Sequence, residues 1–169
     1  MSSQKLNLAI DFDSKKSSMI QAFDDEYFMK QALKEANLAF DKDEVPIGAV
    51  IVANQKIIAR AHNLTETLND VTAHAEMQAF TAAADFLGGK YLQDCTLYVT
   101  VEPCVMCTGA SYWAQVSRIV FGAQDIRNIQ KGVSKTKLYH PKTELLGGVM
   151  EDDCKDLIQF FFEAKRKLQ

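Results

Sequence analysis

Two short segments, distant in the chain, carry the residue types that bind transition metals in proteins. They are Thr72-Ala73-His74-Ala75-Glu76 and Pro103-Cys104-Val105-Met106-Cys107. The imidazole of His74 and the thiolates of Cys104 and Cys107 are three ligands for a tetrahedral zinc ion, whose fourth corner stays open for water. Glu76 is not needed as a ligand, and its carboxylate could move the protons of that water. A fold that satisfies this pattern must bring the two segments together around one ion.

The spacing inside each segment favours this convergence. Cys104 and Cys107 are three residues apart, so on a helix they share one face. Pro103 suits the first position of that helix, where free N–H groups and the positive dipole end stabilise thiolates. We expect His74 in the opening turn of a second helix. His74 and Glu76 would not face each other on a regular helix, so both reach one ion only if it lies beyond the helix end.

Other interpretations of the same residues remain. A lone C-x-x-C is also found in redox and structural sites, although a structural zinc site would need a fourth protein ligand. We interpret His62 and His140 as surface or packing residues, and Cys95 and Cys154 as buried small hydrophobic residues. Two sulfurs and one nitrogen favour Zn²⁺ over Mg²⁺ or Ca²⁺, so we expect one zinc ion per subunit. The joint pattern, H-x-E followed by P-C-x-x-C, is typical of zinc-dependent nucleobase deaminases.

Hydrophobic periodicity predicts helices that alternate with strands. Helices are expected over residues 24–41, 72–86 (with Thr72 as N-cap), 103–115, and in a closing helix with the apolar stripe Leu157, Phe160, Phe161, Ala164 and Leu168. Strands are expected over residues 46–53, 56–61, 95–101 and 118–121, with a further edge strand over 145–149. The first two strands would form a hairpin. This order predicts an α/β sandwich with helices on both faces of one sheet.

The length of 169 residues favours one domain, over residues 23–169, after a weakly ordered N-terminal extension over residues 1–22. No basic start is followed by an apolar region, and no run of 18 apolar residues occurs, so we expect a cytoplasmic protein. The net charge of −3 does not favour nucleic-acid binding by the surface as a whole. Any such contact must therefore come from a local patch.

The sequence resembles bacterial tRNA-specific adenosine deaminases, which are cytidine/deoxycytidylate deaminase-like zinc enzymes, from about residue 27 to residue 162. The matching blocks are residues 44–50 (E-V-P-I-G-A-V), Asn63, 72–76 (T-A-H-A-E), 96–107 (T-L-Y-V-T-V-E-P-C-V-M-C) and 120–123 (V-F-G-A). The resemblance implies a three-layer, cytidine-deaminase-like fold with a five-stranded mixed sheet, usually assembled as a homodimer. It also implies conversion of adenosine to inosine at the wobble position of a tRNA anticodon.

By position, the resemblance assigns zinc binding to His74, Cys104 and Cys107 and the proton shuttle to Glu76. It assigns a contact with the target base to Asn63, which is alternatively a turn residue. Val45, Pro46 and Ile47 would line the pocket, although they equally suit the packed start of a strand. The backbone N–H of Ala75 is a candidate donor to the oxygen that develops negative charge during the reaction.

One segment departs from the resemblance. The family commonly carries a short K-T-G-A-A-G-like loop after the block at 120–123, whereas this chain has Q-D-I-R-N-I-Q-K-G-V-S-K over residues 124–135. Residues 124–142 hold five Lys and Arg residues against one Asp. Arg127, Lys131 and Lys135 are therefore candidate contacts to RNA phosphates, and the alternative is a solvated loop.

Three functions stay open at this point. The first is deamination of adenosine in tRNA. The second is deamination of a free base or nucleoside, of the guanine or cytosine type, which needs the same zinc site but no basic rim. The third is a catalytically silent RNA-binding or partner subunit with structural zinc, against which Glu76 argues.

Overall fold

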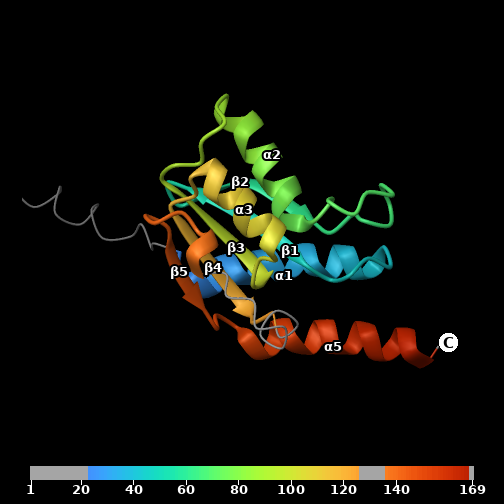
Figure 1. Ribbon diagram of the computed structural model, residues 1–169. Helices are drawn as coiled ribbons and strands as arrows, with labels where there is room; N and C mark the ends of the chain where they lie inside the picture. Colours follow the sequence, from blue (N-terminus) through green and yellow to red (C-terminus); the bar gives the residue numbers. More distant parts are fainter. Residues whose placement is uncertain (1–22, 126–135, 168–169) are drawn as a thin grey trace, which may run out of the picture.

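The structure is a computed structural model that describes residues 23–125 and 136–167. It contains one mixed sheet of five strands in the order β2-β1-β3-β4-β5, with helices on both faces (Figure 1). The strands are β1 (Gly48–Ala53), β2 (Lys56–His62), β3 (Cys95–Val101), β4 (Arg118–Ala123) and β5 (Glu144–Gly147). The helices are α1 (Asp25–Asp41), α2 (Ala75–Leu87), α3 (Val105–Ala114), α5 (Glu151–Lys167) and the short 3-10 helix η1 (Thr136–Leu138). The predicted α/β sandwich is confirmed.

The sheet begins with the expected hairpin. β1 pairs with β2 and with β3 in antiparallel register, while β3, β4 and β5 run parallel. Asn54 and Gln55 form the two-residue turn, and both have positive φ angles, 49° and 61°. Two successive residues of positive φ give a turn whose twist matches that of the paired strands.

Each face of the sheet has its own hydrophobic core. α2 and α3 cover one face, where Phe80, Leu97, Val99 and Ile119 are buried together. α1 and α5 cover the other face, where Phe28, Met29, Val50, Tyr98 and Val120 are buried. Because both faces of the central strands are covered, β1 and β3 read as continuous apolar runs rather than alternating ones.

Helix α1 begins as the sequence predicts. The Asp24 carboxylate accepts a hydrogen bond from the Tyr27 backbone N–H at 2.8 Å and caps the helix. The helix then packs so closely on β1 that a Cβ at Gly48 would lie 2.1 Å from the Ala32 carbonyl oxygen. Glycine at this position therefore sets the distance between α1 and the sheet.

The apolar stripe predicted for the closing helix is partly wrong. Cys154 and Phe161 are the buried residues of α5, whereas Phe160 is 61% exposed. Phe160 instead stacks on Phe40 of α1, with ring centroids 5.8 Å apart. Helix α5 packs against β4 and β3 with Cys154 and Phe161 turned toward the sheet, and Phe160 lies outside this contact face. Leu168 lies outside the described residues, as do residues 1–22 and most of the basic segment.

Across residues 23–125 and 136–167, no helix combines the length and the apolar character needed to cross a membrane.

Candidate metal centre

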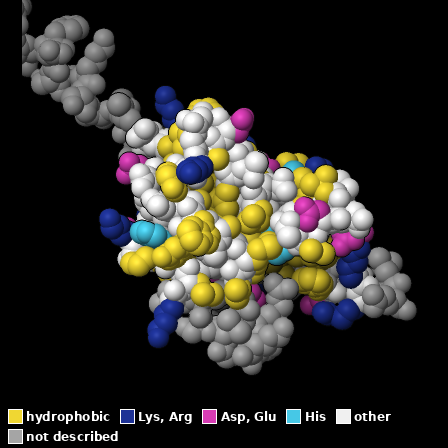
Figure 2. All heavy atoms as spheres, turned by 45° about the horizontal axis from the view of Figure 1, so that its top comes forward, with side chains coloured by type: hydrophobic (Ala, Val, Ile, Leu, Met, Phe, Trp, Pro, Cys, Tyr) yellow, Lys and Arg dark blue, Asp and Glu magenta, His cyan; other side chains and the backbone are white. Residues whose placement is uncertain are grey.

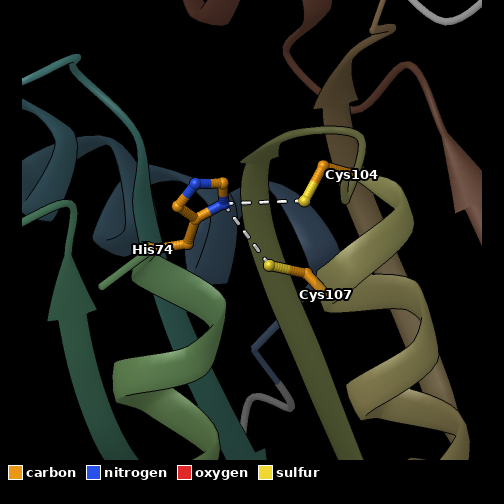
Figure 3. Close-up of side chains that lie close together, drawn as sticks. All are labelled: His74, Cys104 and Cys107. Atoms are coloured by element: carbon orange, nitrogen blue, oxygen red, sulfur yellow. Dashed lines mark hydrogen bonds between the residues drawn. The ribbon is translucent and has the colours of Figure 1, made fainter. Parts of the chain in front are cut away.

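His74, Cys104 and Cys107 point toward one another at the starts of two neighbouring helices (Figure 3). His74 Nδ1 lies 3.6 Å from Cys104 Sγ and 3.6 Å from Cys107 Sγ. Zinc–nitrogen and zinc–sulfur bonds of ordinary length at a tetrahedral angle separate the two ligand atoms by about 3.6 Å. The three side chains therefore stand at the spacing that a tetrahedral metal ion requires. Within the described part of the chain, the group includes no fourth His, Cys, Asp or Glu.

Helix N-termini carry these ligands, as the spacing predicted. His74 is the N-cap of α2 and Cys104 is the N-cap of α3, and both have extended backbone conformations. Cys107 lies in the first turn of α3 and is buried. The structure shows no capping hydrogen bond from the His74 side chain to α2, and the imidazole faces the two sulfur atoms (Figure 3).

The exact helix starts differ from the prediction. Thr72 does not cap α2, because its N–H and hydroxyl both donate to Asp70 Oδ1, at 2.8 and 2.7 Å, in the preceding loop. Pro103 precedes the N-cap of α3 and is not its first residue. Threonine and proline are favoured at helix starts, but here the ligand residues occupy the cap positions.

Glu76 lies in the first turn of α2 and is 3% exposed. Its Oε2 atom has no hydrogen-bond partner among the described residues. Burial, together with the negative charge of Cys104, raises the pKa of this carboxyl group to about 7. A buried carboxylate oxygen without a partner, next to three metal ligands, fits a site built for a metal ion and a water molecule.

The two thiols share a negative charge. Hydrogen bonds from the Cys107 thiol and from His74, with one from the Cys107 backbone N–H, lower the pKa of Cys104 to about 4. The pKa of Cys107 is raised, because its proton bonds to the Cys104 sulfur and because the thiol is buried. A bound metal ion would deprotonate both.

Asn63 lies beside this group. Its backbone N–H donates to the Ile47 carbonyl at 3.0 Å, and the next N–H, of Leu64, donates to the Ala73 carbonyl at 3.0 Å. These bonds join the strand start that contains Val45 and Pro46 to the segment that precedes His74. Pro46 and Ala75 are buried and Val45 is half-buried. The residues predicted to contact substrate are thus neighbours of the metal ligands.

Sequence reasoning missed two buried polar groups of this region. Glu44 is fully buried and bonds the Asn63 amide, but in the sequence it is one acidic residue before an apolar run. Tyr139 is buried after η1, and its hydroxyl has no partner among the residues described. Burial raises the pKa of Tyr139 to about 12, with contributions from the charges of Glu102 and Glu76. No spacing rule links either residue to the metal motif.

The remaining histidines and cysteines behave as predicted. His62 lies 2.9 Å from Lys42 Nζ and 3.3 Å from Glu35 Oε2, and the His140 ring lies against Tyr112. Cys95 and Cys154 are buried free thiols. Of the basic segment, Arg127, Lys131 and Lys135 lie outside the described residues, whereas Lys137 and Lys142 are exposed.

Comparisons with known proteins agree with this geometry. The family model of the MafB19-like deaminases matches residues 23–164. The tRNA-specific adenosine deaminase of Bacillus subtilis (strain 168) is 46% identical over 147 residues, which cover 85% of this chain and 91% of the relative. The enzyme of the same name from Agrobacterium fabrum is 41% identical over 144 residues, covering 83% of this chain and 95% of the relative.

Solved structures of deaminases have the same fold. One, from work on A-to-I editing by tRNA:A34 deaminases at the wobble position of transfer RNA, has a TM-score of 0.68 and 38% identity. The match covers 78% of this chain and 98% of that one. A guanine deaminase from Bacillus subtilis has a TM-score of 0.60 and 39% identity, and covers 65% of this chain and 71% of its own. The chain matches the MafB19-like deaminase family model and belongs to the family of the tRNA-specific adenosine deaminases.

Proposed function

We propose that this protein is a zinc-dependent hydrolytic deaminase that converts adenosine to inosine at the wobble position of tRNA. The observation that carries the proposal is the group of His74, Cys104 and Cys107 beside the buried Glu76 carboxylate, one oxygen of which has no partner in the described part of the chain. The tRNA-specific relatives, which match along 83–85% of this chain, support the substrate.

His74, Cys104 and Cys107 would hold the ion, because one imidazole and two thiolates are ligands that zinc prefers to magnesium or calcium. Bound zinc would supply the Lewis acid that makes a water molecule nucleophilic at neutral pH. In such a reaction, the oxygen of a water molecule would form the new bond to C6 of adenine, and the C6–N bond would break with release of ammonia.

Glu76 would carry the protons. Its carboxylate would take one proton from the attacking water and deliver it to the adjacent ring nitrogen. It would then pass the second proton of that water, released as the C6 carbonyl forms, to the departing amine. Burial raises the pKa of the Glu76 carboxyl group, which suits a group that must accept and donate a proton in one turnover. Burial keeps bulk water from competing for that proton.

The pocket residues would orient the base. We propose that Asn63 contacts the adenine or its ribose, that the Ala75 N–H stabilises charge on the reacting oxygen, and that Val45 and Pro46 line the pocket. Ala75 is the first residue of α2, and the first N–H groups of a helix have no acceptor within it. Arg127, Lys131 and Lys135 would contact phosphates of the anticodon arm.

We further propose a cytoplasmic homodimer. Trp113 is 78% exposed on α3, with Val105 and Tyr112 also exposed on that helix. Figure 2 shows hydrophobic side chains gathered on the side of the molecule that α2 and α3 cover. An exposed apolar patch of this kind is typical of subunit interfaces. A Trp113→Glu variant should be a monomer by light scattering, and a wild-type monomer would contradict the proposed dimer.

The reducing cytoplasm would keep Cys104 and Cys107 available as thiolates.

The substrate is tested by incubating the zinc-loaded protein with a tRNA transcript that has adenosine at the wobble position, and separately with guanine, cytosine and adenosine. We expect inosine at that position and no ammonia from the free compounds. If ammonia is released from guanine and no inosine forms in the tRNA, the result would support a free-base deaminase, an alternative suggested by the similarity to guanine deaminase. Zinc binding without either product would support a catalytically silent subunit.

A further inference from the structure

Glu44 is a buried carboxylate outside the metal group, and both of its oxygens accept hydrogen bonds. Its Oε2 accepts from Asn63 Nδ2 at 3.1 Å, from the Thr65 hydroxyl at 3.3 Å and from the Glu66 N–H at 3.2 Å. Its Oε1 accepts from the Thr67 N–H at 2.7 Å. Burial alone would raise the pKa of Glu44, but the hydrogen bonds from Thr67, Glu66 and Thr65 outweigh it and hold the pKa below its usual value. Glu44 is therefore an anion that can only accept.

This anion fixes which end of the Asn63 amide faces it. The Asn63 Nδ2 group lies between Glu44 Oε2 and Thr65 Oγ1, at 3.1 and 3.0 Å. The one hydroxyl hydrogen of Thr65 is donated to Glu44, so Oγ1 can only accept from Asn63. Both neighbours of Nδ2 are therefore acceptors. If the amide were reversed, its carbonyl oxygen would face the Glu44 carboxylate and the hydrogen bond between the two side chains would be lost.

The consequence concerns what Asn63 can offer a ligand. Both Nδ2 hydrogens are used within the protein, so only the carbonyl oxygen Oδ1 is left. An amide with free rotation could donate or accept, whereas this one presents an acceptor. The backbone bonds of residues 63 and 64 hold it beside the segment that carries His74.

We propose that Glu44 is a positioning residue that locks the Asn63 carboxamide with its oxygen toward the substrate. The site thereby selects a substrate group that donates a hydrogen bond, either the exocyclic amine of adenine or a ribose hydroxyl. The inference rests on the proposed contact between Asn63 and the nucleoside. It gives Glu44 a role in that function, and it specifies that the substrate donates the hydrogen bond and Asn63 accepts it.

The proposal is tested by a swap in which the carboxylate and the carboxamide of positions 44 and 63 are exchanged. Glu44→Gln places an amide where Asn63 needs an acceptor, and we expect kcat/KM on the tRNA transcript to fall roughly 10- to 100-fold. Asn63→Asp sets two carboxylates against each other and should cost at least as much. In the double variant, the new amide at position 44 donates to the new carboxylate at position 63, which still offers an oxygen to substrate. We expect the double variant to regain roughly tenfold or more over Glu44→Gln.

Controls separate positioning from folding. Asp41→Asn changes an exposed carboxylate at the end of α1 and should leave kcat/KM within about twofold of wild type. Tm and zinc content are measured for every variant. If Glu44 only stabilised the loop, activity would follow Tm and the swap would restore nothing. Additive losses in the double variant, or a Glu44→Gln variant within about twofold of wild type, would overturn the proposal.

Thr65 provides a second route if Glu44→Gln does not fold. Thr65→Val removes the acceptor that holds Nδ2, whereas Thr65→Ser keeps it, so kcat/KM should fall several-fold in the first and stay near wild type in the second. Equal activity of the two would overturn the proposal. An inactive wild type would overturn the proposed function as well, whereas an active wild type with these failures overturns only the role of Glu44.

The source of the donated hydrogen bond is found with a transcript that carries 2′-deoxyadenosine at the wobble position. If Asn63 accepts from the ribose hydroxyl, Glu44→Gln should cause no further loss on this substrate. If it accepts from the adenine amine, the full loss should persist. Either result, together with rescue by the swap, supports the locked orientation.

Discussion

Glu44 and Glu76 are both buried carboxylates next to the proposed pocket, yet their environments shift their pKa values in opposite directions. Glu44 receives four hydrogen bonds, and its pKa is lowered. Glu76 has an oxygen without a partner among the described residues, and burial raises its pKa to about 7. The difference shows that the supply of donors, and not burial alone, decides whether a carboxyl group is a fixed anion or a proton carrier.

The largest effect should come from removing a metal ligand. Unlike Glu44, Glu76 is expected to find its partner in water held by the metal ion, so loss of the ion should abolish activity. Cys104→Ala should lose zinc and produce no detectable inosine. Cys154→Ala, which removes a buried thiol from the other face of the sheet, is the matched control and should keep both. Zinc content and inosine formation are measured on the same preparations. A Cys104→Ala variant with full activity would remove the metal from the mechanism.

Replacing the proton carrier should have the next largest effect. Glu76→Gln keeps the shape of the side chain but cannot accept the proton, so kcat should fall roughly 10²- to 10⁴-fold. Zinc should remain bound, because Glu76 is not part of the ligand group. Single-turnover inosine formation checks this prediction. A variant within about tenfold of wild type would assign the proton transfer to another group.

Substitutions of Glu76 should reduce activity more than substitutions of Glu44, but substitutions of Glu44 should reduce the unfolding free energy more. Glu44→Ala leaves buried donors without an acceptor, and each one that stays buried costs about 1–3 kcal/mol of unfolding free energy. Glu76→Ala removes a carboxyl group of which one oxygen has no hydrogen-bond partner among the described residues, and it should cost less. Urea unfolding of the zinc-loaded variants measures both values. A larger loss for Glu76→Ala would contradict the assignment of Glu44 as the structural anion.

The smallest effect concerns pH. In zinc-free protein, the raised pKa of Glu76 means that the folded state binds more protons than the unfolded state between pH 4.5 and about 7. The unfolding free energy should therefore fall as pH rises through this window, by at most ~3 kcal/mol relative to Glu76→Gln. Glu44 has the opposite sign, since its stabilisation is present above pH 4.5 and lost as pH falls below it. Unfolding at several pH values compares the two, and a parallel profile for wild type and Glu76→Gln would refute the raised pKa.

The sequence predicts well where periodicity or ligand chemistry is strong. Strand β3 (Cys95–Val101) has the predicted bounds, because its residues are mostly apolar or β-branched and a proline follows the strand closely. His74, Cys104 and Cys107 converge as predicted, because three ligands for one ion leave few alternatives.

Other features depend on contacts that no local pattern contains. The helix starts were misplaced because Thr72 bonds Asp70 instead of capping α2. Phe160 is exposed and stacks on Phe40 of α1 instead of packing on the sheet, a contact that periodicity does not report. The role of Glu44 depends on a loop some twenty residues further along the chain, and only the folded structure shows which end of the Asn63 amide it faces.

The central claim is that a metal ion with one open coordination position lies beside Glu76 Oε2, which has no partner within residues 23–125 and 136–167. X-ray absorption at the zinc edge of the purified protein tests it most directly. We predict one zinc per chain, bonded to one nitrogen, two sulfurs and one oxygen that exchanges with solvent water. A zinc ion with four protein ligands, or a fully active protein without zinc, would contradict it.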